Sequence, residues 1–209
     1  MPINKTVRLE AKDYIPTETK KDLIVLHHTV GGTALSTINY WKTDPNRIAT
    51  AYIVERDGVV YEVFDPKYWA FHLGLKGSGG AVDKRSIGIE IASEGGLTQR
   101  DGKLYCFGVV SERTLFKQEY YDNEMTWREY RFFDAYSAPQ ISAVSELIAR
   151  LCEQFNIPRQ TPANHFDADD SYRQFAGILG HHHLRPDKSD VHPGFRWQRV
   201  VDECKLAVV

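Results

Sequence analysis

The residues with the clearest capacity for chemistry lie in one run near the C-terminus, GHHHLRPDKSDVHPGF at 180–195, which holds four histidines, two aspartates and a lysine. A second group, His27-His28, follows an apolar run. A hydrolytic zinc ion takes three nitrogen, sulfur or carboxylate ligands and keeps one position open for water. A lone histidine is more often a hydrogen-bonded core or surface residue, so the density of the two groups is what favours a metal site. Non-haem iron uses the same ligands, which leaves the metal open.

Spacing narrows the choice of ligands. Successive side chains of a strand point to opposite faces, so His27 and His28 cannot both serve one site. If the triplet at 181–183 is extended, its middle histidine points to the face opposite to that of the other two. Asp190 and His192 would share a face, so alternation does not separate them.

Two further residues could act beside a metal. In SIGIEIAS at 86–93 the isoleucines form one face of a strand, and Glu90 lies on the other, which is otherwise small and polar. Glu90 is either a solvent-facing residue of an edge strand or a general base or acid for water activated by the metal, with Gly88 leaving room for substrate. Lys188 is ordinarily a solvated loop lysine; beside a metal it could stabilise the oxyanion formed when water attacks an amide.

The elements that must position these residues alternate between strands and helices. The pattern predicts a buried strand at 22–29, a helix at 31–42 capped by Thr33, two strands joined at Asp57-Gly58 within 50–64, a strand at 86–93, a long helix at 138–155, and helical segments at 171–180 and 194–208. This order predicts an α/β fold, a central mixed β-sheet flanked by helices on both faces, with sites at strand ends.

The chain is expected to form a single domain over 1–209, with a core at about 20–200. Residues 98–135 are polar, aromatic-rich and unperiodic, apart from a hairpin predicted in DGKLYCFGVV, and are interpreted as an insertion over one end of the sheet. A monomer is expected.

Composition excludes several classes of function. The net charge is −2 and no Lys/Arg block stands out, so nucleic acid is not an expected partner. No stretch approaches the ~20 apolar residues of a membrane span, and the N-terminus lacks the apolar run of a secretory signal. Three cysteines without a CxxC pair indicate neither a disulfide framework nor a thiolate zinc site, and favour a reducing compartment.

Several segments occur in a characteristic order: LIVLHHTVGG, AYIVERDGVVYEVF, WAFHLG, KRSIGIEI, the helix containing Gln140, and GHHHLRPDKSD followed by PGF. Together they resemble the type 2 zinc amidases, the N-acetylmuramoyl-L-alanine amidase family that includes peptidoglycan recognition proteins and amidase-type phage lysozymes. The resemblance covers about residues 20–200.

The resemblance implies one zinc ion held by His27, His181 and Asp190. Family members with a carboxylate ligand typically read Lys-x-Asp-Pro-Gly, whereas Val191 and His192 separate the aspartate from Pro-Gly here. Counting back from Pro-Gly would make His192 the third ligand. The spacing from the lysine and from His181 favours Asp190.

The resemblance also assigns roles around the metal. Glu90 matches the acid/base glutamate of some members, and Lys188 matches the oxyanion-stabilising lysine. Other members use a tyrosine where this chain has Thr50, with Tyr52 two residues further on. Tyr52, together with His72 of WAFHLG and His28, is expected near the substrate groove, in binding or in support of the ligands.

The implied reaction is hydrolysis of the amide between N-acetylmuramic acid and the L-alanine of peptidoglycan or muropeptides. The alternatives are a recognition module that binds peptidoglycan without cleaving it, and a hydrolase of another amide on the same scaffold. The chain is expected to be synthesised in the cytoplasm without a signal peptide. It would act on the cell wall as a phage-type lysin, or in the cytoplasm as a recycling amidase.

Overall fold

A six-stranded mixed sheet forms the centre of the computed structural model, which describes residues 2–209. Its strand order is β1 (Ile3–Asn4), β4 (Val60–Glu62), β3 (Tyr52–Val54), β5 (Ser86–Ile91), β2 (Leu23–His28) and β11 (Gly177–Gly180). Neighbouring strands are parallel except β3 and β4, which form the hairpin predicted at Asp57-Gly58. The prediction of a mixed sheet is confirmed.

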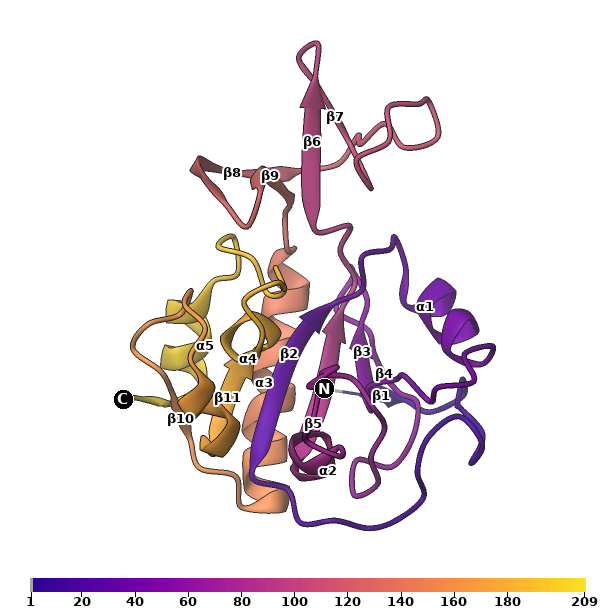
Figure 1. The fold of residues 1–209 in the computed structure, drawn as a ribbon, viewed down its shortest axis with the longest axis vertical. Helices are drawn as coiled ribbons and strands as arrows, with labels where there is room; N and C mark the ends of the chain where they lie inside the picture. The colour runs from indigo at the N-terminus through magenta and orange to yellow at the C-terminus, as the bar shows by residue number, and fades with distance from the viewer. Residues whose placement is uncertain (1) are drawn as a thin grey trace.

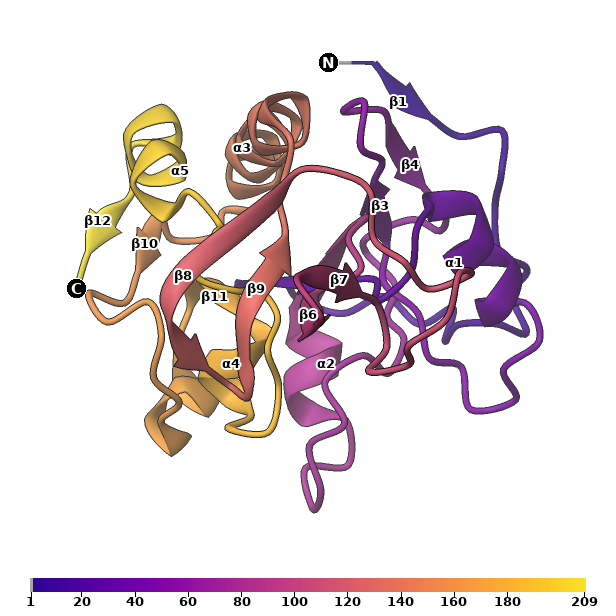
Figure 2. The ribbon, with the colours of Figure 1, turned by 90° about the horizontal axis from the view of Figure 1, so that it is seen from above.

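Helices cover both faces of this sheet, as predicted (Figure 1). The larger core lies against α3 (Ala138–Phe155) and α5 (Trp197–Cys204), which run side by side in Figure 2. On the other face Leu23, Val25 and Leu179 pack with side chains of α2 (Ala81–Arg85) and α4 (His181–Leu184). Because β2 is buried throughout, its first four residues, LIVL, form one apolar run rather than an alternation.

The start of the long helix α3 is fixed by a capping box at Ser137. Ser137 accepts a hydrogen bond from the backbone N–H of Gln140, and the Gln140 side chain accepts one from the Ser137 backbone. The Gln140 amide also donates to the carbonyl of Ala92, at 2.8 Å, just beyond β5. This bond ties the helix to the strand that carries Glu90. The shorter α1 (Ala34–Trp41) begins at the predicted cap, Thr33.

The prediction of a helix at 171–180 is wrong for the second half of that segment. A 3₁₀ helix, Asp170–Gln174, is followed by strand β11, in which Ile178 pairs with Ile24 and Gly180 with Leu26 of β2. A short apolar run carries no periodicity that distinguishes a buried strand from a helix, and pairing with β2 decides the outcome.

Residues 98–135 are more ordered than the sequence indicates. Strands β6 (Gly96–Arg100), β7 (Lys103–Tyr105), β8 (Tyr120–Trp127) and β9 (Tyr130–Asp134) form an antiparallel sheet in the order β7-β6-β9-β8, called the accessory sheet below. It lies beyond the C-terminal ends of β2 and β5 (Figure 1).

The remaining elements are peripheral: β10 (Gln160–Thr161) pairs with β12 (Ala207–Val208). The three cysteines are free and buried. Over residues 2–209, the helices are all too short or too polar to span a bilayer.

Candidate metal centre

Three predicted ligands meet at the C-terminal edge of the central sheet. His27 is near the end of β2, His181 follows β11 directly, and Asp190 lies in the loop after α4. The Nδ1 atoms of His27 and His181 are 3.1 Å apart, and each lies 3.0 Å from Oδ2 of Asp190. All three side chains are buried. Pairing of β2 with β11 brings the two histidines together, which spacing along the chain could not show.

The hydrogen bond made by the outer nitrogen of His181 fixes its tautomer. Nε2 lies 3.0 Å from the carbonyl oxygen of Leu73, which can only accept. Nε2 therefore carries the proton, and Nδ1 presents a lone pair to the cluster.

A relay of hydrogen bonds fixes the tautomer of His27. The hydroxyl of Ser86 donates to the carbonyl of Asp83 at 3.1 Å, so its oxygen accepts from Nε2–H of His72 at 2.7 Å. His72 Nδ1 then accepts from Nε2–H of His27 at 2.9 Å. The Nδ1 lone pair of His27 consequently faces His181 and Asp190.

The protonation states also suit a cation. Burial, followed by the neighbouring His181, lowers the pKa of His27 to about 4, so the ring is neutral at neutral pH. Burial alone would raise the pKa of Asp190, but positive charge on His181 or His27 lowers it well below its usual range, and a bound cation would act in the same sense. The cluster thus offers the neutral imidazole of His27, the Nδ1 lone pair of His181 and the carboxylate of Asp190.

This donor set fits zinc. Tetrahedral zinc with ligand bonds of ~2.0–2.1 Å has ligand atoms about 3.3 Å apart, close to the 3.0–3.1 Å separations found here. The fixed outer hydrogen bonds of both histidines resemble the supporting contacts that metal-ligating imidazoles require. These residues therefore have the chemistry, spacing and support of a three-ligand site.

Glu90 lies beside this cluster and not on an edge strand. It pairs in register with His27 on the central strand β5, so the two side chains share a face of the sheet. Burial raises the pKa of Glu90 well above its usual value, and Asp190 raises it further, whereas Lys188 lowers it. Its Oε2 is buried and has no hydrogen-bond partner among the described residues. An unsatisfied carboxylate oxygen beside three metal-type donors is suited to accept a proton from a bound molecule.

Two hollows flank the cluster. One, of about 360 Å³, is lined by Glu90, by Thr29 and by residues of α1 including Thr37 and Tyr40. The other, of about 210 Å³, is lined by His181, His72, Lys188, Arg185 and others. Glu90 and Lys188 therefore face space open to a ligand on either side of the cluster.

Of the three residues expected at the substrate groove, His72 alone borders one of the two hollows. Tyr52 points to the opposite face of the sheet, where its hydroxyl donates to Glu62 at 3.2 Å. His28 is turned away from His27 by strand alternation, and its Nδ1 lies 3.1 Å from the hydroxyl of Tyr136. His72 borders the smaller hollow, but both of its ring nitrogens are engaged, so it orients His27 rather than offering a polar atom to substrate. Tyr52 and His28 therefore line neither of the two hollows.

His192, the alternative third ligand, lies outside the cluster. Its ring stacks between those of Phe133 and Tyr136, with centroids 4.7 and 4.3 Å away. Its Nε2–H donates to the carbonyl of Asp134 at 3.0 Å, and its Nδ1 accepts from the backbone N–H of Gly194 at 3.1 Å. Both faces and both nitrogens are occupied, so this residue anchors the loop to the base of the accessory sheet.

The triplet at 181–183 is helical, so strand alternation does not apply to it. His182 and His183 turn away from the cluster, with Nε2 atoms 2.7 and 3.1 Å from backbone carbonyls of the 164–165 segment. Sequence reasoning missed the supporting residues Ser86 and Asp83. The small polar face of SIGIEIAS was the available signal for Ser86.

A family model described as N-acetylmuramoyl-L-alanine amidase matches residues 17–195. The chain belongs to this amidase family. Solved structures with a similar fold include PlyL, at 16% identity and a TM-score of 0.58, with each chain covered over 100%. The catalytic domain of XlyA matches at 16% and 0.57, covering 98% of this chain and 99% of that one.

A third similar structure is AmiD from E. coli in complex with the substrate anhydro-N-acetylmuramic acid-L-Ala-D-gamma-Glu-L-Lys. It matches at 17% identity with a TM-score of 0.56, over 90% of the amidase described here and 59% of AmiD. A search of curated proteins found no significant match. The identities are low, so these likenesses concern the fold.

Proposed function

We propose that this family member is a zinc-dependent hydrolase that cleaves the amide between N-acetylmuramic acid and the L-alanine of peptidoglycan or muropeptides. The observation that carries the proposal is the convergence of His27 Nδ1, His181 Nδ1 and Asp190 Oδ2 within 3.1 Å of one another. A zinc ion held there would supply Lewis acidity, polarising the scissile carbonyl and making water acidic near neutral pH.

The proton transfers fall to Glu90. As a carboxylate it takes a proton from the attacking water, and as the acid it returns that proton to the nitrogen of the departing L-alanine. Its raised pKa favours both steps, because it makes the carboxylate a stronger base towards water and lets the carboxyl group keep the proton until the amine departs. The nearby Asp190 charge contributes to this shift.

Lys188 has a separate task. Its ammonium borders the hollow that His181 also lines, where it would stabilise the negative charge that develops on the carbonyl oxygen. The muramyl and peptide sides of the substrate would occupy the two hollows beside the cluster.

Mass spectrometry of the products tests the proposal. Zinc-loaded protein is incubated with purified peptidoglycan and, separately, with a soluble muramoyl peptide, each with an EDTA-treated control. Release of peptides that begin with a free L-alanine amine, abolished by EDTA and restored by zinc, is expected. Protein that pellets with the wall and cleaves neither substrate would instead be a recognition module.

A further inference from the structure

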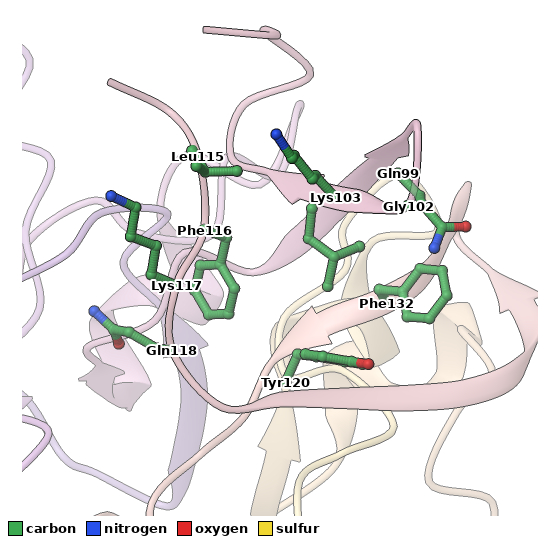
Figure 3. A pocket seen from close by; sticks show the side chains of 10 residues that line it. Gln99, Gly102, Lys103, Leu115, Phe116, Lys117, Gln118, Tyr120 and Phe132 are labelled. Atoms are coloured by element: carbon green, nitrogen blue, oxygen red, sulfur yellow. The ribbon is translucent and has the colours of Figure 1, made fainter. Parts of the chain in front are cut away.

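The accessory sheet carries a pocket of about 370 Å³, well apart in sequence from the metal ligands. Figure 3 shows the rings of Phe116 and Phe132 turned towards the hollow and Tyr120 along its lower edge. Lys103 and Lys117 stand at its rim. The amidase chemistry proposed above uses none of these residues.

The floor of the pocket is aromatic. Phe132 is buried in the small core of the accessory sheet, and Phe116 packs against that core. Tyr120 meets Phe132 edge to face, with centroids 5.8 Å apart, and remains 51% exposed. Such rings present flat apolar faces at low conformational cost, suited to the C–H faces of a sugar ring.

The rim is polar and positively charged. Lys103, Lys117, Gln99 and Gln118 are all exposed around it. None of the described residues that line the pocket is an aspartate or a glutamate. The pocket therefore offers ammonium groups to carboxylates and amides to hydroxyl or acetamido groups.

The accessory sheet and its loops also expose several apolar side chains. Fifteen large apolar side chains are exposed in the described part of the chain, and six of them belong to the accessory sheet and its loops: Phe107, Val109, Val110, Tyr120, Tyr121 and Met125. Of these six, Tyr120 lines the pocket itself. The accessory sheet stands beyond the C-terminal ends of β2 and β5, the edge at which the metal-type cluster lies (Figure 1).

We propose that this pocket is a second, non-catalytic binding site for the peptidoglycan polymer, in which a sugar ring lies on the aromatic floor and stem-peptide carboxylates pair with the two lysines. The proposal rests on the proposed function, because the ligand is another part of the polymer that the cluster would cleave. A polymer held at the accessory sheet presents its scissile bonds at a high effective concentration, whereas a single muramoyl peptide gains nothing.

Charge reversal tests the lysines. Lys103→Glu/Lys117→Glu is compared with Lys20→Glu/Lys205→Glu, which makes the same change in net charge at exposed sites outside the pocket. All are prepared in a Glu90→Ala background and pelleted with purified peptidoglycan at low temperature. Two lost ion pairs, replaced by repulsion, should weaken binding by about tenfold relative to the control pair.

The aromatic floor is tested in the same way with Tyr120→Ala. Its control is Met125→Ala, which removes a side chain that is 75% exposed on the same strand but does not line the pocket. We expect several-fold weaker binding for Tyr120→Ala and wild-type binding for Met125→Ala.

Two further measurements distinguish peptidoglycan binding at the pocket from a general loss of function and from binding of phosphate polymers. Hydrolysis of the soluble muramoyl peptide, with Glu90 restored, should stay within about twofold of wild type in the pocket variants, so loss in pelleting combined with intact hydrolysis supports the proposal. Equal pelleting of the pocket and control variants would overturn it, even if the amidase activity stands. A defect seen with walls that carry phosphate polymers, but absent after acid removal of those polymers, would also overturn it and assign the pocket to phosphate.

Discussion

At the scale of single residues, the site depends on which nitrogen of each histidine carries a proton. His181 and His27 both expose Nδ1 because their Nε2 atoms donate elsewhere, one to a backbone carbonyl and one to His72. The third donor, Oδ2 of Asp190, lies 3.0 Å from each of these Nδ1 atoms. A set of donors prepared in this way loses little freedom when a cation binds.

The roles of base and ligand can be separated by substitution. Glu90→Gln should retain zinc and lose at least ~100-fold in turnover, because the amide cannot accept the proton. His27→Ala should lose both zinc and activity, since two protein donors remain. Zinc content by atomic spectroscopy and release of L-alanine peptides check both; hydrolysis at the wild-type rate by Glu90→Gln would remove Glu90 from the mechanism.

The relay behind His27 makes a further prediction. Ser86→Ala removes the acceptor of the His72 proton, so the orientation of His27 loosens and zinc affinity should fall by about 10- to 100-fold. Ser142→Ala, a serine exposed on α3, is the control. Competition with a chromogenic chelator measures the affinity, and identical affinities in the two variants would contradict the relay.

At the scale of elements, the loop after α4 is held from outside the central sheet. His192, two residues beyond Asp190, is clasped by Phe133 and Tyr136 at the junction of the accessory sheet with α3. Val191 and His192, which separate the aspartate from Pro193-Gly194, thus form a buried anchor. The loop that carries Asp190 is consequently packed against the base of the accessory sheet through His192.

This anchor predicts a graded response. His192→Ala opens a cavity between two rings and should lower the free energy of unfolding by about 3 kcal/mol. His192→Phe keeps the stacking and loses two hydrogen bonds, so its loss should be smaller, about 1–2 kcal/mol. Urea denaturation of the metal-free variants measures both, and a Phe variant as unstable as the Ala variant would show that stacking contributes little.

At the scale of the whole molecule, histidine burial links stability to pH. The pKa is lowered, with burial the largest cause, for His27, His28, His72, His165, His182, His183 and His192. Burial raises the pKa of two carboxyl groups, Glu90 and Glu94, which act in the opposite sense. The unfolded chain therefore takes up more protons than the folded one as pH falls below about 6.5.

The sign of this effect gives a measurable result. A histidine whose folded pKa is depressed favours folding above its unfolded value, and that contribution is lost as pH falls from about 6.5 towards the folded pKa. With a net uptake of one proton or more, unfolding free energy in EDTA should drop by at least ~2 kcal/mol between pH 6.5 and 5. Equal or greater stability at pH 5 would show that the raised carboxyl groups dominate.

The sequence by itself determined the α/β class, the family resemblance and most elements, because those features are written in local patterns. The run LIVLHH, the caps around α3 and the Asp57-Gly58 turn each depend on a few neighbouring residues. Strand alternation is also a local pattern, and it placed the side chains of His27 and His28 on opposite faces of the sheet.

Tertiary structure alone decided which distant residues and strands contact one another. Asp190 and His192 are two residues apart and equally able to bind a metal, and only packing sends one towards His27 and the other between two aromatic rings. GILG became a strand because β2 was available to pair with it, and the accessory sheet formed from a segment with no clear period. These outcomes depend on contacts between residues far apart in the chain, which local propensity does not encode.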